Sequence, residues 1–334
     1  MQTPALFHLE DGALRYTGPY GRRGVAWIRE HLADRYARED IAAWAQALLE
    51  EYTVEVARTW LRQTGLRKLA VAGGVFANVK LNQRLHELDE VDALFVYPNM
   101  GDGGLSLGAV CELERLAPRP LANAFLGESY TNAQIAEALA RASMASEPVD
   151  DPEATVAQLA AENQIVARFQ GAMEWGPRAL GNRSILTRAV DPAVTGKLNR
   201  MLDRSDFMPF APALLDEDAD RYCLGAAAAR HAAEFMTVCF DCTETMRRAH
   251  SPIVHVDGTA RAQLVRQETN PGFHRILTLL KEHVGSSVVL NTSFNIHEEP
   301  IIRTPDEAVA AFVKAGLDAL VIGNYLVRQP HAAA

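Results

Sequence analysis

Two strand–turn–helix units in the first third of the chain constrain its fold more than any other feature. The first, RKLAVAGGVFANVKLNQRLHEL, runs from an apolar strand through paired glycines into a helical pattern, and the second joins VDALFVYP to GDGGLSLGAVCELERL. A longer helical pattern over residues 40–65, which we expect to face the core and to stop at Gly65, precedes both. The order α, β, α, β, α predicts a largely parallel sheet covered by helices, with ligands at the carboxyl ends of its strands.

A second domain is indicated beyond residues 116–129, where two prolines and several small residues interrupt the periodicity in the manner of a linker. Many strand-like runs precede any long buried helix there, and they are IVARFQG, SILTRAV, FMPFAPALL, FMTVCFDCT, ARAQLVR, SVVLNTSF and LDALVIGNYLV. The last helix should begin with a capping box made by Thr304 and Glu307, with Pro305 in its first turn. We therefore expect α/β structure over residues 1–118, followed by an α+β domain with a twisted mixed sheet over residues 124–334.

Composition excludes several classes of protein. A net charge of −9 disfavours the broad basic surface that DNA binding requires, and no apolar run approaches the roughly 20 residues needed to cross a bilayer. The first residues, MQTPALFHLEDGALRY, have neither the cationic start nor the apolar core of a secretory signal. We expect a cytoplasmic protein that binds small anions, with neither DNA nor a membrane as a partner.

The cysteines do not suggest a disulfide framework, because the chain has only four and they are unevenly spread. Cys239 and Cys242 form a C-x-x-C pair, but a zinc site needs two more ligands and a redox site needs a thioredoxin-like helix start. Since the surrounding run FMTVCFDCT has the pattern of a β-strand, a structural role is favoured for this pair.

Two glycine turns are candidate ligand sites. In AGGVFAN, Gly73 and Gly74 would let the backbone approach a ligand, and the start of the following helix favours phosphate or ribose oxygens. In GDGGLSLG, Asp102 could coordinate a hard metal ion that bridges nucleotide phosphates. A tight strand-to-helix turn and an exposed turn aspartate are alternatives of about equal weight for the two motifs.

Arginines and small polar residues form the remaining candidates. In MEWGPRALGNRS, a turn at Gly176 and Pro177 presents Arg178, with Arg183 five residues on, and two guanidinium groups suit an oxyanion clamp. HVDGTAR and NTSFN each place polar side chains at a strand or turn edge. The members of NTSFN that could hold a phosphate or a planar amide are Asn291, Thr292, Ser293 and Asn295. Surface arginines in the first motif and a side-chain-bonded turn in the last are the alternatives.

Taken in order, AGGVFAN, GDGGLSLGA, MEWGPRALGNRSIL, FMPFAPALL, HVDGTARAQLV and NTSFNIHEEPI resemble the NodU-type O-carbamoyltransferases, whose members modify nodulation factors and antibiotics. The resemblance implies the second lobe of an actin-like ATPase fold over residues 1–118 and a YrdC-like domain over residues 124–334. It implies that the YrdC-like domain converts carbamoyl phosphate and ATP to carbamoyl-adenylate. The actin-like domain would then pass the carbamoyl group to a hydroxyl of a small molecule, such as a sugar or natural product.

The resemblance also implies roles for individual residues. The expected catalytic residues are Arg178, Arg183, Ser293 and Asn295. The expected ligands of nucleotide or carbamoyl phosphate are Gly73, Gly74, Asn78, Arg204, Arg261, Asn291 and Thr292. Asp102 is the expected metal ligand.

Three departures from the family pattern stand out. Relatives carry an H-x-x-x-H pair in a first actin-like lobe, and none of the ten histidines here has that spacing. Asp102 would then belong to an incomplete site, so a divalent metal (Fe, Mg or Mn) is expected only where such a lobe, on another chain or in a homo-oligomer, completes it. Arg204 stands in a stretch where relatives place a lysine and an arginine, and Glu298 stands where a glycine is frequent.

An alternative function is a nucleotide-binding remnant or regulatory partner of a full-length homologue, without turnover. Transfer of a threonylcarbamoyl group to tRNA, which uses similar folds, is disfavoured by the acidic charge.

Overall fold

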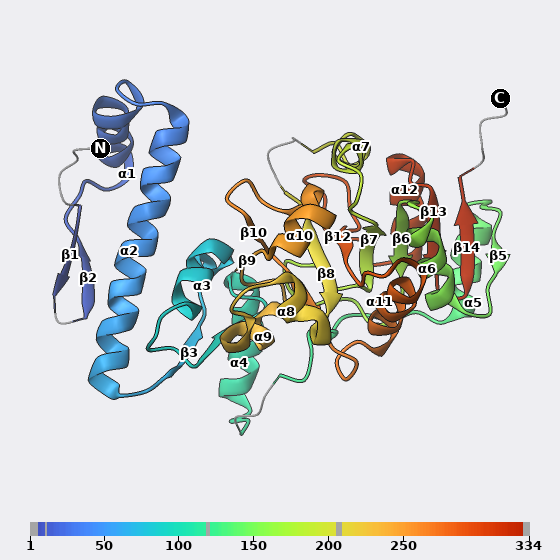
Figure 1. Cartoon of the computed structure of the whole chain (residues 1–334), viewed down its shortest axis with the longest axis horizontal. Coiled ribbons are helices and arrows are strands. Elements are labelled where there is room, and N and C mark those ends of the chain that lie inside the picture. Colours follow the sequence, from blue (N-terminus) through green and yellow to red (C-terminus); the bar gives the residue numbers. More distant parts are fainter. Residues whose placement is uncertain (1–5, 11, 118–120, 205–208, 330–334) are drawn as a thin grey trace.

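The computed structural model describes residues 6–10, 12–117, 121–204 and 209–329 (Figure 1). The first part of the chain contains β1 (Phe7–Glu10), β2 (Ala13–Tyr16), α1 (Gly21–Ile28), α2 (Arg38–Thr64), β3 (Lys68–Val71), α3 (Val79–His86), β4 (Ala93–Val96) and α4 (Leu105–Leu113). Residues 118–120 of the predicted linker, residues 207–208 of the run FMPFAPALL, and the ends of the two predicted domains at 1–5 and 330–334 lie outside the described residues.

The second part of the chain carries most of the strands. Its elements are α5 (Asn132–Arg141), β5 (Glu147–Pro148), α6 (Pro152–Ala161), β6 (Val166–Phe169), β7 (Arg183–Thr187), α7 (Ala193–Met201), β8 (Ala211–Leu215), α8 (Ala219–Tyr222), α9 (Arg230–Ala233), β9 (Phe240–Asp241), α10 (Glu244–Ala249), β10 (Thr259–Ala260), β11 (Gln263–Val265), α11 (Pro271–Val284), β12 (Val289–Ser293), α12 (Pro305–Ala315), β13 (Ala319–Ile322) and β14 (Tyr325–Arg328).

The long helix expected before the two units is α2, and it ends at Gly65 in the left-handed conformation, with φ 69°. The prediction that it faces the core holds in part, because Leu61 is buried and half-buried Leu49, Val54 and Ala57 pack against the main apolar cluster. Another part of the helix meets the β1–β2 hairpin, where the rings of Tyr52 and Phe7 lie 5.2 Å apart. In Figure 1, α2 stands at one end of the molecule, away from the large sheet.

The two strand–turn–helix units are present as predicted. Strands β3 and β4 pair in parallel, with Val71 opposite Val96, and they are followed by α3 and α4. Among the described residues this parallel sheet has two strands. The turn after β3 contains Gly73, whose φ is 122°. The Gly73 N–H donates to the carbonyl of Met100 at 2.7 Å. A residue with a side chain would rarely adopt that φ.

The second part is built on an eight-stranded mixed sheet in the described residues, with the order β11-β8-β12-β7-β6-β13-β14-β5. Successive side chains on one strand join different apolar clusters: Val166 packs with α6 and α11, and Ala167 packs with α5 and α12. Helices therefore cover both faces, which explains why the strands read as nearly continuous apolar runs. The predicted mixed sheet is confirmed.

Three predicted strands differ from the structure. In FMTVCFDCT, only Phe240 and Asp241 form a strand, because the preceding backbone turns at Met236, with φ 55°, and Cys239 N–H donates to the carbonyl of Val79 instead. ARAQLVR divides between β10 and β11, and LDALVIGNYLV is the hairpin β13–β14 rather than one strand. The alternation of apolar residues does not mark such breaks, since buried turns are apolar too.

The start of the last helix matches its prediction in detail. The Thr304 side chain accepts from the N–H of Glu307, the Glu307 side chain accepts from the N–H of Thr304, and Pro305 occupies the first turn of α12.

The two thiols of the C-x-x-C pair have raised pKa values. Burial raises the pKa of the Cys239 thiol and raises that of Cys242 to about 11. Both thiols are therefore protonated at neutral pH, which agrees with a structural role for the C-x-x-C pair.

One apolar cluster contains side chains from both parts of the chain. It joins Leu81 and Leu85 of α3 and Val96 of β4 to Phe240 and to the sheet face covered by α5 and α12. Buried Asn82 reinforces the junction, because its Nδ2 donates to the carbonyl of Thr237 at 2.6 Å. Since the core is continuous across residues 118–124, the division into two domains stays a prediction.

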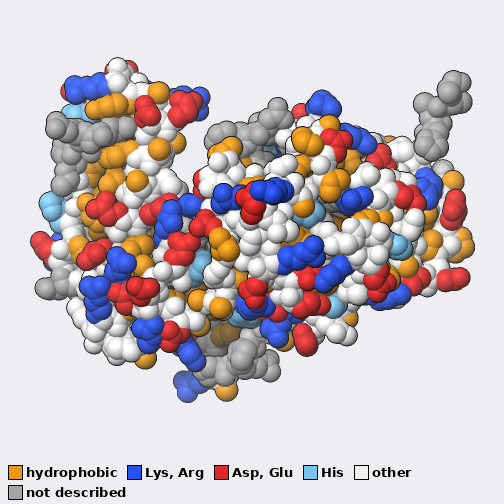
Figure 2. All heavy atoms as spheres, viewed as in Figure 1, with side chains coloured by type: hydrophobic (Ala, Val, Ile, Leu, Met, Phe, Trp, Pro, Cys, Tyr) orange, Lys and Arg blue, Asp and Glu red, His pale blue; other side chains and the backbone are white. Residues whose placement is uncertain are grey.

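The surface agrees with the charge balance. Lys and Arg side chains alternate with Asp and Glu side chains over the face shown in Figure 2, and no broad basic area covers it. Within the described ranges, no helix combines the length and the apolar character that crossing a membrane would need.

Candidate functional site: an arginine-lined cavity

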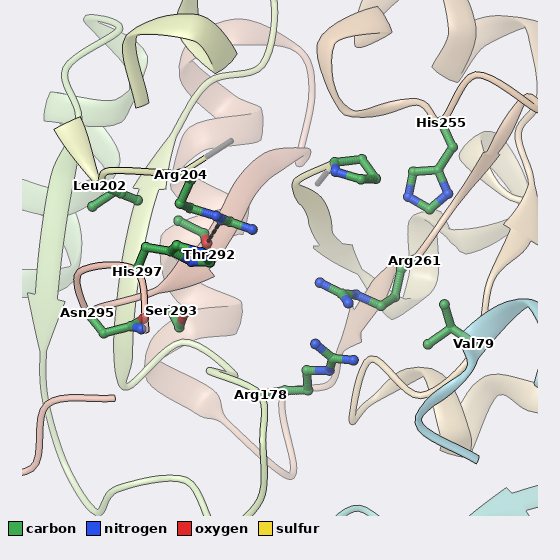
Figure 3. Close-up of a pocket in the computed structure, with 11 residues that line it drawn as sticks. Val79, Arg178, Leu202, Arg204, His255, Arg261, Thr292, Ser293, Asn295 and His297 are labelled. Atoms are coloured by element: carbon green, nitrogen blue, oxygen red, sulfur yellow. Dashed lines mark hydrogen bonds between the residues drawn. The ribbon is translucent and has the colours of Figure 1, made fainter. Parts of the chain in front are cut away.

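Segments far apart in the sequence line a cavity of about 330 Å³, and most of them belong to the second part of the chain. Its lining residues are Val79, Arg178, Leu202, Arg204, Pro209, His255, Arg261, Thr292, Ser293, Asn295 and His297. Figure 3 shows Arg178, Arg261 and His255 on one side, and Arg204, Thr292, Ser293 and Asn295 on the other. The structure thus brings together residues from four of the six motifs singled out in the sequence, and Val79 adjoins a fifth, AGGVFAN.

The cavity has a strong excess of positive charge. Arg178, Arg204 and Arg261 form no ion pair with a carboxylate of the described residues, and the buried Nε atom of each has no hydrogen-bond partner there. Burial lowers the pKa of all three, and for Arg261 the nearby charges of Arg178 and Arg204 lower it further. Guanidinium groups buried together without partners are costly unless an anion joins them. The cavity is therefore suited to a phosphate or another multiply charged oxyanion.

A buried carboxylate shapes the loop that carries Arg178. Glu174 Oε1 accepts hydrogen bonds from the backbone N–H groups of Leu180 at 2.7 Å, Asn182 at 2.8 Å and Arg183 at 3.2 Å. These three bonds close the segment between residues 174 and 183 into a compact turn. Arg178 stands at the middle of that turn, and its side chain reaches the cavity (Figure 3).

The opposite wall is formed where β12 ends. Arg204 lies over the ring of Phe210 at 4.7 Å and donates through Nη1 to Thr292 Oγ1 at 3.1 Å. Nδ2 of Asn295 donates to the carbonyl groups of Ile296 at 3.0 Å and Glu299 at 2.7 Å, which fixes its amide. This wall therefore offers hydroxyl and amide groups beside a cation, as NTSFN predicted.

The loop after this strand contains Glu298, which stands where relatives of the resembling family often have glycine. Its φ is 66°, in the left-handed region that glycine adopts easily. The loop therefore keeps a glycine-like conformation with a non-glycine residue.

Two predicted site residues lie outside the cavity. Arg183 is fully buried over Phe169, at 3.7 Å, and its Nη atoms donate to the carbonyl groups of Gln170 at 2.8 Å and Gly171 at 3.1 Å. Asn291 is buried in β12 and donates to Gln263 Oε1 at 2.8 Å. The structure does not bring either side chain to the arginines of the cavity, because both are buried and hydrogen-bonded elsewhere in the fold.

The second group of predicted residues surrounds the β3–β4 sheet and not the cavity. Gly74 and Gly101 are close neighbours, since a Cβ on Gly101 would lie 4.0 Å from the Gly74 Cα. Asn78 caps α3, with its Oδ1 accepting from Leu81 N–H at 3.0 Å. Asp102 is exposed at the start of a short 3₁₀ turn. In the described part of the chain, no group of three or more His, Cys, Asp or Glu side chains could hold a metal ion, so the metal prediction at Asp102 gains no support.

His255, His297, Leu202, Pro209 and Val79 line the cavity but were not predicted as site residues. His255 had the clearest signal, since it begins the motif HVDGTAR, of which only Arg261 was singled out. Its Nδ1 lies 3.1 Å from Thr259 Oγ1, and burial lowers its pKa below the ordinary value of 6.5. His297 lies two residues beyond NTSFN, and the others are apolar residues whose types carry no chemical signal.

Comparison with known proteins gives two family matches. The model described as Carbamoyltransferase C-terminus matches residues 157–329, and the one described as Carbamoyltransferase N-terminus matches residues 25–111. Between them, the two matches include all of the residues predicted for the site.

Individual relatives agree with these matches. Nodulation protein NolO of Bradyrhizobium diazoefficiens is 33% identical over 92% of this chain and 56% of its own length. A 3'-hydroxymethylcephem-O-carbamoyltransferase of Streptomyces clavuligerus is 29% identical over 98% of this chain and 62% of its own length. The chain thus spans about half the length of the curated relatives that it matches. A solved structure of full-length HypF gives a TM-score of 0.38 at 20% identity, over 54% of this chain and 22% of HypF, a similarity that carries no functional conclusion.

Proposed function

Because this chain belongs to the carbamoyltransferase family, we propose that its arginine-lined cavity activates a carbamoyl group by forming carbamoyl-adenylate from carbamoyl phosphate and ATP. The observation that carries this proposal is the set of three partly buried arginines in one cavity that have no carboxylate partner among the described residues. Both proposed substrates are phosphate anions. A volume of about 330 Å³ is near the lower end of the range of roughly 300–1,000 Å³ found for small-molecule sites.

The chemistry of the step requires fixed positive charge more than it requires a nucleophilic side chain. A carbamate oxygen attacks the α-phosphorus of ATP, the bond to the β-phosphate oxygen breaks, and pyrophosphate leaves. Negative charge grows on the leaving pyrophosphate, and the guanidinium groups of Arg178, Arg204 and Arg261 can stabilise it. Ser293 and Asn295 face the same space and are proposed to orient the carbamoyl group.

The acceptor step is a separate proposal. The name of the Streptomyces clavuligerus relative describes transfer of a carbamoyl group to a hydroxyl on a small molecule, and we propose an acceptor of that class. The glycine turns at Gly73 and Gly74, with Asn78 and Asp102, would contribute to the transfer site in a lobe of actin-like fold.

Residues 124–334 would form the YrdC-like activating domain. The proposed location is the cytoplasm, which supplies ATP and carbamoyl phosphate.

The activation step can be tested by isotope exchange between ATP and pyrophosphate in the purified chain. We expect exchange that depends on carbamoyl phosphate, and an Arg261→Met variant should lower its rate by about 100-fold because a charge facing the leaving group is removed. Arg248→Met is the control, since the Arg248 side chain is 79% exposed in a surface ion pair. Nucleotide binding without exchange in the unmodified chain would contradict the proposal and would support a binding protein without turnover.

A further inference from the structure

His255 lies on the side of the cavity that carries Arg178 and Arg261, and it is a titratable lining side chain there that is not an arginine (Figure 3). Burial lowers its pKa, and of the charged groups near it Asp257 raises the pKa while Arg261 and Lys80 lower it. At neutral pH the imidazole is therefore uncharged. An uncharged imidazole beside two arginines can accept a proton, which no guanidinium group can do.

A hydrogen-bonded chain fixes which nitrogen of His255 is basic. Lys80 pairs with Asp257 at 2.8 Å, and although burial opposes it, hydrogen bonds from Lys80 and Thr259 lower the pKa of Asp257 to about 2. The carboxylate can therefore only accept, so Thr259 Oγ1 donates its proton to Asp257 Oδ1 at 2.7 Å. Thr259 Oγ1 must then accept from His255 Nδ1, at 3.1 Å. The proton of the neutral imidazole sits on Nδ1, and Nε2 is left with its lone pair.

Nε2 of His255 is free to act on a ligand, since it has no hydrogen-bond partner among the residues of the described ranges. We propose that His255 is the general base that activates water for the cleavage of carbamoyl phosphate to carbamate inside the arginine-lined cavity. This assignment rests on the proposed function. It concerns the step before adenylation, for which neither the motifs nor the relatives' names point to a residue.

The proposed step balances without another reactant. Nε2 takes a proton from water, the water oxygen bonds to the carbamoyl carbon, and the bond from that carbon to the phosphate oxygen breaks. Carbamic acid passes its proton to the departing phosphate, which gives carbamate, hydrogen phosphate and a protonated His255. The arginines neutralise the phosphate as it forms, and the carbamate oxygen is then the nucleophile for ATP.

The experiment separates this step from adenylation by supplying carbamate directly. Ammonium bicarbonate solutions contain carbamate at equilibrium, so ATP–pyrophosphate exchange is measured once with carbamoyl phosphate and once with ammonium bicarbonate. A His255→Gln variant should lower the exchange rate with carbamoyl phosphate by about 100-fold, the low end of the usual contribution of a general base. Its exchange rate with ammonium bicarbonate should stay close to that of the unmodified chain.

Two further variants sharpen the result. Thr259→Val removes the acceptor that fixes the proton on Nδ1, and it should lower the carbamoyl phosphate-dependent rate selectively, although less than His255→Gln does. His283→Gln alters an exposed histidine on α11 and should change neither rate. In the unmodified chain the carbamoyl phosphate-dependent rate should fall only below pH 6.5, because burial lowers the pKa of His255 from that ordinary histidine value. This inflection should be absent from His255→Gln.

The outcomes distinguish the two levels of the proposal. Equal losses of both rates in His255→Gln would show that His255 only binds ligand or supports the fold, and unchanged rates would show that it has no part in the reaction. Either result overturns the assignment and leaves the proposed function standing. If the unmodified chain exchanges with neither substrate, the proposed function fails and the assignment fails with it.

Discussion

Buried arginines in this molecule fall into two kinds that differ in what their guanidinium groups contact. Arg168 pairs with Glu153 at 3.3 Å and donates to the carbonyl of Gly181 at 2.7 Å, and Arg183 donates to several backbone carbonyls. Arg261 has neither kind of partner among the described residues, and two more arginines lie near it. The first kind stabilises the fold, whereas the second is stable only when a ligand brings negative charge.

This contrast predicts opposite effects of the same substitution at two buried arginines. Arg168→Met should lower the free energy of unfolding by about 3–5 kcal/mol because it leaves Glu153 without its partner. Arg261→Met should raise it by on the order of 1 kcal/mol because it removes an uncompensated buried charge.

Urea unfolding with and without inorganic phosphate measures both effects. Phosphate should stabilise the unmodified chain more than Arg261→Met. A loss of stability in Arg261→Met without ligand would show that Arg261 is already compensated in the free protein.

His250 gives the stability a defined dependence on pH. Burial lowers its pKa to about 4 from the ordinary 6.5, and its Nε2 lies 2.9 Å from Ser286 Oγ. Between pH 6.5 and 4 the unfolded chain binds more protons than the folded one, so this contribution to stability is present above pH 6.5 and is lost as the pH falls toward 4. The loss should be about 3 kcal/mol, because the pKa falls from 6.5 to about 4 and each pKa unit corresponds to roughly 1.4 kcal/mol. His250→Gln should flatten the curve of unfolding free energy between pH 7 and 4, and an unchanged slope would assign the dependence to other groups.

At the scale of elements, the Arg178-bearing loop depends on its packing against α11. Gly181 in this loop has φ 115°, and a Cβ at that position would lie 2.4 Å from Cδ1 of Phe273, a fully buried ring on α11. Both the backbone conformation and the space therefore require glycine. The helix α11 is in turn fixed by its contacts with α6, so the position of the loop depends on the whole face of the sheet.

Two glycine substitutions on the same part of the fold should differ sharply in cost. Gly181→Ala should destabilise the protein by about 3 kcal/mol or more, since strain and overlap with Phe273 add. Gly285→Ala, at the end of α11, has a similar positive φ of 76° but no atom within 4 Å of the added Cβ, and it should cost only about 1 kcal/mol. Thermal unfolding of the two variants compares them directly. Equal losses would mean that backbone strain alone decides, and that the contact with Phe273 does not matter.

Elements with local signals could be predicted from the sequence, and contacts between distant segments could not. The capping box at Thr304 and the stop at Gly65 depend on residues within one turn of the helix end, so both were predicted correctly. The arginines of MEWGPRALGNRS look alike in sequence, yet only Arg178 reaches the cavity. That difference is set by the bonds of Glu174 and by the direction of β7, which adjacent residues do not reveal. His255 was missed because its partners Thr259 and Asp257 become meaningful only when the loop is folded.

The whole molecule is unevenly packed. Among the described residues of 6–64, the buried hydrophobic side chains are Leu32 and Leu61, whereas α3 and β4 share one apolar cluster with the large sheet. Apolar burial is the main source of stability in folded proteins. The hairpin β1–β2, α1 and the first turns of α2 should therefore be the least stable part of the described structure, and residues 68–329 should open together.

Hydrogen exchange followed by mass spectrometry tests this expectation. Peptides from α1 and the first half of α2 should exchange fastest, and peptides from β3, α3 and β12 should exchange slowly and at similar rates near the global limit. Substantially faster exchange in β3 and α3 than in β12 would show that the two parts open independently in spite of their shared core.

The hydrogen-bonded chain that ends at His255 begins at Lys80, on the far side of the predicted domain boundary. Chimeras of two family members can be built by exchanging the segments before and after residues 118–124. Such chimeras would take α3 from one parent and residues 255–259 from the other. A parent without a lysine at the position of Lys80 would leave Asp257 without its ion-pair partner and would weaken the chain that fixes the tautomer of the histidine. Functional chimeras should therefore be those in which these two short segments come from the same parent, wherever the crossover lies.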